Sequence, residues 1–313
     1  MTVKDQLYRW IGRGAVRDAV VVAGSPRSGT TWLAELLGAM PSYKVLDEPL
    51  HLQFPTLPDL GLDWRTYVAP DADRPDLAGY LERAFRGQIR GNYLTMSDSR
   101  LGRFVELVRR PHVVAKFVRA NRMLHWIDAT FDLRGIVLLV RHPCAVVASQ
   151  LDYEHAQTNA WAQATPSNDV EVDLAGSLPD GLVDRFGDRL RRLETREEVL
   201  AALWAVDTYC ALRLHGDAPG PVVTYEDLVA SPHDTLRTLF ASLGISLPDT
   251  VFRQIDLPSE SAASDLHRQD VNRQLSKWQR KLTDEQVDRI LSVTHRFDLD
   301  MYSEHQRPHV HED

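Results

Sequence analysis

The sequence predicts an α/β protein with a doubly wound, mainly parallel sheet flanked by helices. Four short apolar runs rich in β-branched residues are typical of strands, at 19–23, 113–117, 135–140 and 221–225. The runs are continuous rather than alternating, as expected for strands buried on both faces, and helical patterns lie between them. Since such sheets bind ligands beyond the carboxyl ends of their strands, we expect functional residues at that edge.

Length and composition indicate one globular unit. The chain has 313 residues, of which 43% are hydrophobic, enough for a sizeable core. We expect a single domain over 1–313, with its core at about 19–297 and a flexible tail at 298–313. The net charge of -8 argues against a nucleic-acid partner, so a phosphate site must be local.

Cysteine content and hydropathy indicate in which cellular compartment the protein works. The two cysteines, Cys144 and Cys210, lie far apart and suggest neither a disulfide framework nor a thiolate metal site. The sequence has no stretch typical of a signal peptide and no apolar run near the ~18 to 20 residues of a membrane span. We therefore expect a cytoplasmic protein with no membrane span; nothing indicates its oligomeric state.

Two segments look like insertions that shape a substrate pocket. Residues 52–112 are rich in proline and include a helical pattern at 77–90. Residues 151–195 include a polar, aperiodic stretch at 156–181, which is typical of a lid or a partly disordered loop. Aromatic residues of these segments could stack on a substrate or simply pack: Trp64, Tyr67, Tyr153 and Trp161.

Three helices are expected in the C-terminal half. One covers 194–215 with mixed faces, and a second begins at Ser231 or Asp234 and ends at Gly244. The last begins after Thr283, which forms a capping-box pattern with Gln286.

The first strand is followed by the loop "GSPRSGTT" at 24–31, which has the spacing of the phosphate-binding pattern G-x-x-x-x-G-K-[ST]. Thr30 stands where that pattern has lysine, Thr31 takes the hydroxyl position, and Arg27 lies inside the loop. Glycines and the N–H groups of a helix N-terminus can surround a phosphate, so we predict a P-loop-like fold. Its phosphate site would comprise Ser25, Arg27, Ser28, Gly29, Thr30 and Thr31.

A second motif, "RHPCAVVAS", follows the strand at 135–140. Arg141 lies just past the strand, and Ser149 lies in the helix that Pro143 can open. The planar fork of arginine suits a phosphate, although a surface arginine and a helix serine would also explain the pattern. The strand ends in arginine rather than the aspartate that holds magnesium in NTPases. Together the two motifs favour a nucleotide phosphorylated at two positions.

These residues carry a resemblance. "SPRSGTTWL" resembles the 5′-phosphosulfate loop of the sulfotransferases that use 3′-phosphoadenosine 5′-phosphosulfate (PAPS), and "RHPCAVVAS" resembles their 3′-phosphate motif. "VVTYEDLVASP" and "SKWQRKLTDEQ" resemble further segments, so the likeness spans about 19–297. It implies transfer of a sulfuryl group from PAPS to a hydroxyl, with 3′,5′-ADP as product and no metal. The absent lysine then has a reason, because this donor has no γ-phosphate.

The resemblance also suggests catalytic residues. Members of the aryl and steroid type carry a histidine shortly after a lysine at the second strand, but here Val118 follows Lys116 at that place. The chain is closer to the carbohydrate-type and bacterial branch, in which the glutamate of an "EP" segment is the base. In "VLDEPLH" this is Glu48, which Pro49 should hold extended; Asp47 and His51 remain alternative bases.

Further roles follow from the same resemblance. Arg27 and the loop amides would serve the leaving phosphate, and Lys116 would support the sulfuryl group or the acceptor unless it is simply ion-paired. Further nucleotide contacts are expected from Tyr225, Arg268, Arg273, Lys277 and Trp278, although Trp278 could instead be a core residue. His142 is expected to be structural, and the histidines of the tail are not expected to form a metal site.

The acceptor, the hydroxyl of a carbohydrate or another small metabolite, is not specified further by the sequence. Two other functions stay open at this point: a P-loop kinase or NTPase with a divergent loop, and a nucleotide-binding module without catalysis.

Overall fold

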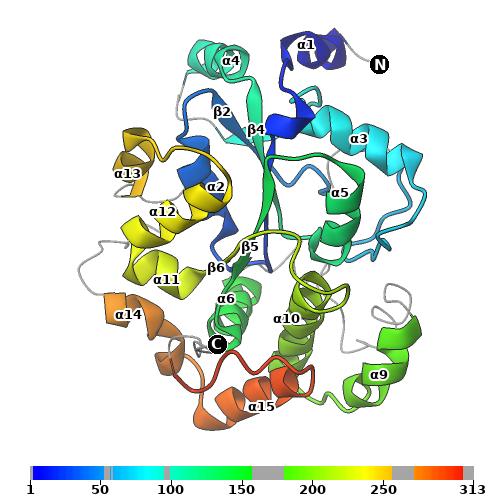
Figure 1. The fold of residues 1–313 in the computed structure, drawn as a ribbon. Helices are drawn as coiled ribbons and strands as arrows, with labels where there is room; N and C mark the ends of the chain where they lie inside the picture. Colours follow the sequence, from blue (N-terminus) through cyan, green and yellow to red (C-terminus); the bar gives the residue numbers. More distant parts are fainter. Residues whose placement is uncertain are drawn as a thin grey trace.

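The computed structural model describes residues 3–52, 57, 59–94, 99–156, 180–255 and 271–305. It contains a six-stranded sheet in the order β3-β2-β4-β1-β5-β6 (Figure 1). Every neighbouring pair is parallel except β2 and β3, which are antiparallel. The predicted fold class, a mainly parallel sheet flanked by helices, is confirmed. The strands are β1 (Val20–Ala23), β2 (Tyr43–Asp47), β3 (Asn92–Leu94), β4 (His112–Phe117), β5 (Gly135–Val140) and β6 (Val222–Thr224).

Four strands were predicted, and two were missed. The run at 221–225 is one residue too long at its end, because Tyr225 begins helix α11 (Tyr225–Ala230). The missed β2 contains Lys44, which breaks the apolar pattern although its side chain is buried. Lys44 Nζ donates to the carbonyl of Leu107 at 3.1 Å, and burial lowers the pKa of Lys44 to about 8.

Helices cover both faces of the sheet (Figure 1). Along β1, Val20 and Val22 pack into one hydrophobic cluster while Val21 and Ala23 pack into the other, as the alternation of side chains along a strand requires. The first cluster is covered by α2 (Thr30–Gly38), α11, α12 (Pro232–Ser242) and α13 (Asp249–Ile255). The second is covered by α3 (Pro75–Phe85), α5 (Leu124–Thr130), α6 (Pro143–Ala156), α9 (Asp180–Leu190), α10 (Arg196–Leu212) and α15 (Asp284–His295).

The remaining elements are short or peripheral. They are α1 (Val3–Ile11), α4 (Arg100–Arg109), α14 (Val271–Leu275) and the 3-10 helices η1 (Val16–Asp18), η2 (Asn121–Met123) and η3 (Lys277–Arg280).

The three predicted C-terminal helices are present. Thr283 Oγ1 accepts from Gln286 N at 3.3 Å and Gln286 Oε1 accepts from Thr283 N at 3.0 Å, so the capping box of α15 is confirmed. Ser231 takes the N-cap position of α12, which ends at Ser242, and Asp234 lies in its first turn. The mixed faces expected for the helix at 194–215 were wrong, because all residues from Glu197 to Ala211 are buried. Helix α10 is an internal helix that contacts α6 and α15.

Two expected boundaries need revision. Part of the segment 52–112 belongs to the core, since α3 buries Leu77 and Phe85 completely and β3 extends the sheet. The predicted tail begins too early, because Leu299 and Tyr302 are buried and packing therefore continues beyond 297. Most of the predicted lid, 157–179, lies outside the described residues.

Cys144 and Cys210 are both buried and free. Within the ranges that the structure describes, no helix is long and apolar enough to cross a membrane.

Candidate active site

The strand order places the predicted site residues at one edge of the sheet. Strand β1 lies between β4 and β5, and its last residue, Ala23, is in register with Phe117 on one side and Leu138 on the other. The loop that follows β1 therefore stands in the middle of the carboxyl edge. Glu48 and Lys116 lie on its β4 side, and Arg141 lies on its β5 side.

The loop at 24–31 has room only for glycine at two positions. A Cβ on Gly24 would come within 2.4 Å of the carbonyl oxygen of Leu139. Gly29 has φ 97° and lies against Tyr225, whose ring a Cβ would meet at 2.7 Å. Gly29 is also the N-cap of α2 and has no side chain to cap it, so the first N–H groups of α2 remain available for an anion.

The side chains of the loop have three different environments. Thr30 and Ser28 are buried, Thr31 is half-buried, and Arg27 is exposed with φ 71°. Ser28 Oγ is fully buried and has no hydrogen-bond partner among the described residues. Because buried hydroxyls are normally paired, Ser28 is consistent with a loop built around an anion.

The two predicted phosphate motifs are in direct contact. Arg27 Nε donates to Ser149 Oγ at 3.2 Å, although 122 residues separate them in the chain. Arg141 Nη1 donates to the carbonyl of Arg27 at 2.9 Å. Gln150, which the sequence analysis did not select, donates to the carbonyl of Pro26 at 3.0 Å. The loop after β1 and the motif after β5 thus form one surface.

Tyr225 connects this surface to the C-terminal helices. The guanidinium carbon of Arg141 lies 4.2 Å from the centre of the Tyr225 ring, a cation–π contact, and Gln274 Nε2 donates to the Tyr225 hydroxyl at 2.8 Å. Arg141 Nε is buried and has no hydrogen-bond partner within the described ranges. Arg273 lies next to Gln274 on α14 and is exposed, as is Lys277 in η3. The predicted Arg268 lies outside the described residues.

Trp278 has the surroundings of a core residue. It is buried and its ring stacks on His142, with ring centres 4.6 Å apart. Trp278 is therefore the core residue that the sequence analysis gave as the alternative to a nucleotide contact. His142 is packed in the core beside it, as expected for a structural residue. His142 Nδ1 accepts from Cys144 N at 3.2 Å and Nε2 donates to the carbonyl of Ser303 at 2.8 Å. Burial lowers the pKa of His142 to about 4.

A buried carboxylate that the sequence analysis missed supports the Arg141 motif. Glu226 Oε1 accepts from His142 N at 3.0 Å, and its Oε2 accepts from the hydroxyl of Tyr302 at 2.9 Å. Burial raises the pKa of Glu226, while the hydrogen bond from His142 and the nearby Arg141 lower it. The residue directly after Tyr225 therefore fixes the chain next to Arg141 and binds the C-terminal segment to it.

On the β4 side, Glu48 is the centre of a charged cluster. Glu48 Oε1 accepts from the backbone N–H of Val118 at 2.7 Å and lies 2.9 Å from Lys116 Nζ. Its Oε2 lies 3.3 Å from Arg119 Nη1. By the resemblance, Val118 stands at the position of the histidine of the aryl and steroid type, and its backbone N–H contacts this carboxylate.

The backbone at Glu48 differs from the prediction. Pro49 was expected to hold Glu48 extended, but Glu48 has φ 48°, in the left-handed region. A turn explains the difference, because His51 N donates to the carbonyl of Glu48 at 2.9 Å. Glu48 N still donates to the carbonyl of Lys116 at 2.9 Å, so the turn begins where the β2–β4 ladder ends.

Lys116 is an ion-paired lysine, the alternative that the sequence left open. It is buried, and its Nζ also lies 3.0 Å from Asp47 Oδ1. Burial by itself would lower the pKa of Lys116, but the charges and hydrogen bonds of Glu48 and Asp47 raise it above the ordinary value. Lys116 therefore keeps its charge next to Glu48.

The sequence analysis missed Arg119. Its side chain contacts the candidate base Glu48 and lies near the alternative base His51. Its guanidinium carbon lies 4.1 Å from the centre of the Trp64 ring, and His51 meets the same ring edge-on at 5.5 Å. Burial lowers the pKa of His51, and Arg119 lowers it further. Arg119 could have been found by the pattern that identified Arg141. Both are cations just past the carboxyl end of a buried strand. Tyr67 packs elsewhere, against His215, and the side chains of Tyr153 and Trp161 are not described.

A parallel sheet whose central strand ends in a phosphate-type loop, with an arginine motif from the next strand against it, is the arrangement of a P-loop-like nucleotide-binding protein. A protein-family model described as "Sulfotransferase family" matches residues 19–249. The chain belongs to the sulfotransferase family, and it is a sulfotransferase enzyme.

Solved sulfotransferase structures are similar to most of the chain at low identity. The sulfotransferase domain from the Synechococcus PCC 7002 olefin synthase is 18% identical, with 93% of this chain and 97% of that one covered and a TM-score of 0.47. Sulfotransferase STF1 from Mycobacterium tuberculosis H37Rv is 18% identical (93% and 79% covered, TM-score 0.44). Mouse sulfotransferase SULT7A1 complexed with PAP is 15% identical (95% and 91% covered, TM-score 0.41). A comparison with curated proteins found no match.

Potential metal ligands do not cluster in the described part of the chain: no group of three or more His, Cys, Asp or Glu there could hold a metal ion.

Proposed function

We propose that this sulfotransferase moves a sulfuryl group from PAPS to a hydroxyl of a carbohydrate or another small metabolite in the cytoplasm and releases 3′,5′-ADP. The observation that carries the proposal is the contact between the two phosphate motifs. Arg27 reaches Ser149, and Arg141 reaches the backbone of Arg27. A nucleotide with phosphates at two positions needs two such motifs at one site, whereas the phosphates of ATP form one chain at a single position.

The residues present suit the 5′ end of PAPS. The loop requires glycine at 24 and 29, since a Cβ at either position would clash, and this leaves backbone N–H groups accessible. Ser28 Oγ is a buried donor still without a partner among the described residues, and Arg27 supplies positive charge. PAPS would supply the sulfuryl group here, and these donors would stabilise the charge that develops on the leaving phosphate.

The 3′-phosphate is assigned to the β5 side. Arg141 has a buried Nε without a partner in the described ranges and a guanidinium carbon 4.2 Å from the centre of the Tyr225 ring, which suits an arginine that binds a phosphate. Ser149 lies within reach of Arg27 and can offer its hydroxyl. Arg273 and Lys277 are exposed cations on neighbouring elements and are further candidates for this phosphate.

Glu48 is proposed as the base that takes the proton of the acceptor hydroxyl. Its carboxylate is held by the N–H of Val118, by Lys116 and by Arg119, so its orientation is fixed before the acceptor binds. Pre-orientation of this kind is what a general base needs. Asp47 shares Lys116 with Glu48, and His51 lies one turn further along the chain, so both remain alternatives to be tested.

The direct test is transfer of ³⁵S-labelled sulfate from PAPS to a panel of sugars and phenols. Thermal unfolding provides an independent test of the donor. A ligand at 100 times its Kd stabilises the folded state by about 2.7 kcal/mol. We expect this stabilisation from 3′,5′-ADP without magnesium.

Stabilisation by ATP with magnesium alone would overturn the proposed donor. Stabilisation by 3′,5′-ADP without transfer to any acceptor of the panel would support the donor and overturn the proposed acceptor class.

A further inference from the structure

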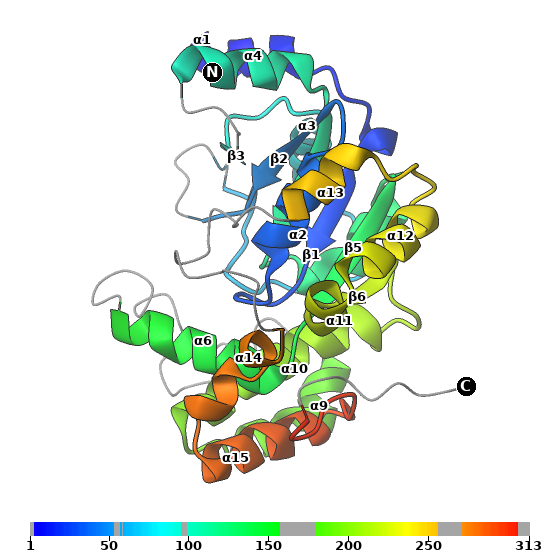
Figure 2. The ribbon, with the colours of Figure 1, turned by 90° about the vertical axis from the view of Figure 1, so that its left-hand side faces the viewer.

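Helices α1 and α4 form an exposed apolar patch at one end of the molecule. Both views place the two helices side by side at the end opposite α6, α10 and α15 (Figures 1 and 2). Seven large hydrophobic side chains are exposed in the described residues, and six of them belong to these two helices. Trp10 is 63% exposed and Leu101 is 73% exposed. We call the six the apolar patch: Leu7, Trp10, Leu101, Phe104, Val105 and Val108.

Helix α4 carries its apolar stripe on the outside. Leu101, Phe104, Val105 and Val108 have the spacing i, i+3, i+4 and i+7, which places them on one helix face. In a surface helix such a stripe normally faces the core. Here the buried residue of α4 is Leu107, whose carbonyl accepts from Lys44. The stripe is therefore left to meet something outside the molecule.

Helix α1 is attached in a similar way. Ile11 is buried, and the Tyr8 ring stacks on Tyr93 with ring centres 5.8 Å apart. Leu7 and Trp10 stay exposed. Both helices thus use a small part of their surface to attach to the protein and present apolar side chains to solvent.

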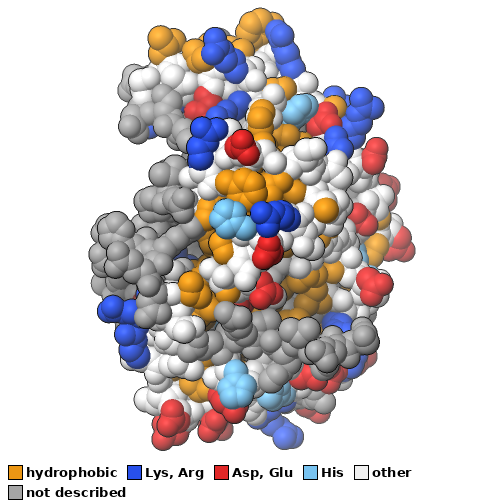
Figure 3. Space-filling model, turned by 60° about the vertical axis from the view of Figure 1, so that its left-hand side comes forward, with side chains coloured by type: hydrophobic (Ala, Val, Ile, Leu, Met, Phe, Trp, Pro, Cys, Tyr) orange, Lys and Arg blue, Asp and Glu red, His pale blue; other side chains and the backbone are white. Residues whose placement is uncertain are grey.

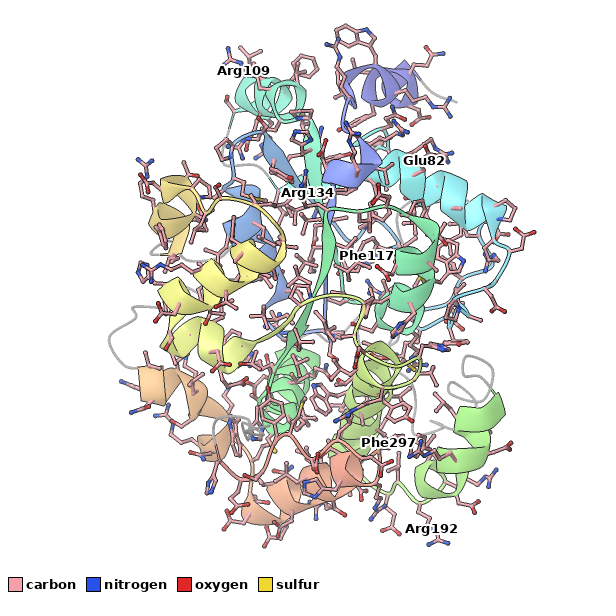
Figure 4. The ribbon with its side chains drawn as sticks, in the orientation of Figure 1. Glu82, Arg109, Phe117, Arg134, Arg192 and Phe297 are labelled. Carbon is pink, nitrogen blue, oxygen red and sulfur yellow. The ribbon has the colours of Figure 1, made fainter. Side chains whose placement is uncertain are left out.

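The two segments that carry the patch are basic, whereas the chain as a whole is acidic. Residues 3–13 and 99–110 together contain seven Lys or Arg and two Asp or Glu, whereas the whole chain has 36 Lys and Arg against 44 Asp and Glu. Arg13 lies over the Trp10 ring, with its guanidinium carbon 5.2 Å from the ring centre. Figure 3 shows hydrophobic and basic side chains together at this end, and Figure 4 shows Arg109 extending outward from α4.

We propose that the patch binds the surface of an anionic phospholipid bilayer, with α1 and α4 lying in the plane of the interface. Exposed Trp, Phe and Leu flanked by arginines are the composition of helices that lie on membranes without spanning them. A second copy of the chain is a poorer occupant, because a two-fold contact through this patch would bring together two surfaces that both have an excess of basic residues.

The position of the patch keeps the active site accessible. Helix α1 precedes β1 and α4 precedes β4, so the patch lies at the amino edge of these parallel strands. The phosphate motifs lie at the carboxyl edge. A membrane-bound molecule would hold its catalytic edge toward water, and binding is independent of the proposed donor and base.

Vesicle flotation tests the proposal with the full chain. We expect binding to vesicles of about 30 mol% phosphatidylglycerol in phosphatidylcholine to be at least about tenfold tighter than to pure phosphatidylcholine, and to weaken with added salt. Replacing both Trp10 and Phe104 by alanine should reduce binding at least about tenfold. Arg109→Gln should reduce it about fivefold, the contribution of one basic residue near the surface.

Arg192→Gln is the matched control, since Arg192 is exposed at the other end of the molecule (Figure 4), and it should bind as the wild type does. All variants should keep the wild-type melting temperature, because the substituted side chains are exposed. Equal binding to neutral and anionic vesicles, or none at about 1 mM lipid, would overturn the proposal. A dimer in sedimentation velocity that the Trp10 and Phe104 substitutions abolish would also overturn it, in favour of a second copy.

Discussion

The two flanks of β1 use positive charge in different ways. On the β5 flank, Arg141 contacts a backbone carbonyl and an aromatic ring and forms no salt bridge within the described residues. On the β4 flank, Lys116 and Arg119 both contact the carboxylate of Glu48. The same sheet edge therefore holds one arginine that pairs with no carboxylate among the described residues and two cations that hold a carboxylate.

The difference follows from what each flank has to do. An arginine binds phosphate strongly only when no carboxylate of the protein already occupies its fork. A base needs a fixed position, and buried cations provide it, although they make the partner carboxylate costly to remove. If this interpretation is right, substitutions on the two flanks should affect different measured quantities.

The largest effect is expected for Glu48→Gln. The glutamine amide cannot take the proton of the hydroxyl that receives the sulfuryl group, so kcat should fall by about 10² to 10⁴-fold. The affinity for 3′,5′-ADP should stay unchanged, because the proposed nucleotide contacts come from the loop after β1 and from the β5 flank and do not include Glu48. Single-turnover sulfate transfer measures the first quantity and calorimetric titration the second.

Asp47→Asn and His51→Ala are the matched controls for Glu48. Asp47 contacts the same Lys116, so its loss disturbs the cluster without removing the proposed base. A melting curve for each variant separates misfolding from lost chemistry, because removing one member of a buried ion pair can cost about 3 to 5 kcal/mol. If Asp47→Asn or His51→Ala loses as much kcat as Glu48→Gln, the base is assigned to the wrong residue.

Arg141→Ala should have the next largest effect, on binding rather than on the proton transfer. Loss of one or two charged hydrogen bonds should weaken 3′,5′-ADP by about 10 to 100-fold or more. The affinity for 5′-AMP should fall much less, since it lacks the 3′-phosphate. Titration of both nucleotides gives the ratio directly, and an equal loss for both would contradict the assignment.

Arg134→Ala is the control for Arg141. Arg134 lies just before β5, at the opposite end of the strand that Arg141 follows (Figure 4), and pairs with Asp18 at the surface. Surface pairs contribute about 0 to 1 kcal/mol to stability, so this variant should bind both nucleotides normally.

The last effect is on stability rather than on binding or catalysis, and it belongs to the β5 flank alone. Because burial lowers the pKa of His142 to about 4, the unfolded chain binds a proton at this residue between pH 6.5 and 4 while the folded protein does not. Folding stability should therefore fall as the pH falls through this window, by up to about 3 kcal/mol from His142. His142→Gln should lose less stability over the same range in urea unfolding at pH 7 and pH 4.5; equal losses would contradict the assignment.

Much of the site was readable from local patterns. The loop at 24–31 and the motif at 141–149 follow apolar runs, and that alone places both at the carboxyl edge of a parallel sheet. Other features left no local pattern. Strand β2 was missed because Lys44 interrupts its apolar pattern. No nearby residue in the sequence shows that the carbonyl of Leu107 accepts a hydrogen bond from this buried lysine. Glu226 resembles an ordinary helix carboxylate, since its partners His142 and Tyr302 lie 84 and 76 residues away.

The sequence by itself determined the class of fold, the phosphate loop and the pair of motifs, because strand periodicity and glycine spacing are local consequences of backbone geometry. Only the tertiary structure decided that Arg27 meets Ser149, that Arg119 joins Lys116 at Glu48, and that the apolar stripe of α4 faces outward. Those contacts depend on which strands are neighbours and on which face of a helix reaches the core. Packing of the whole chain sets both.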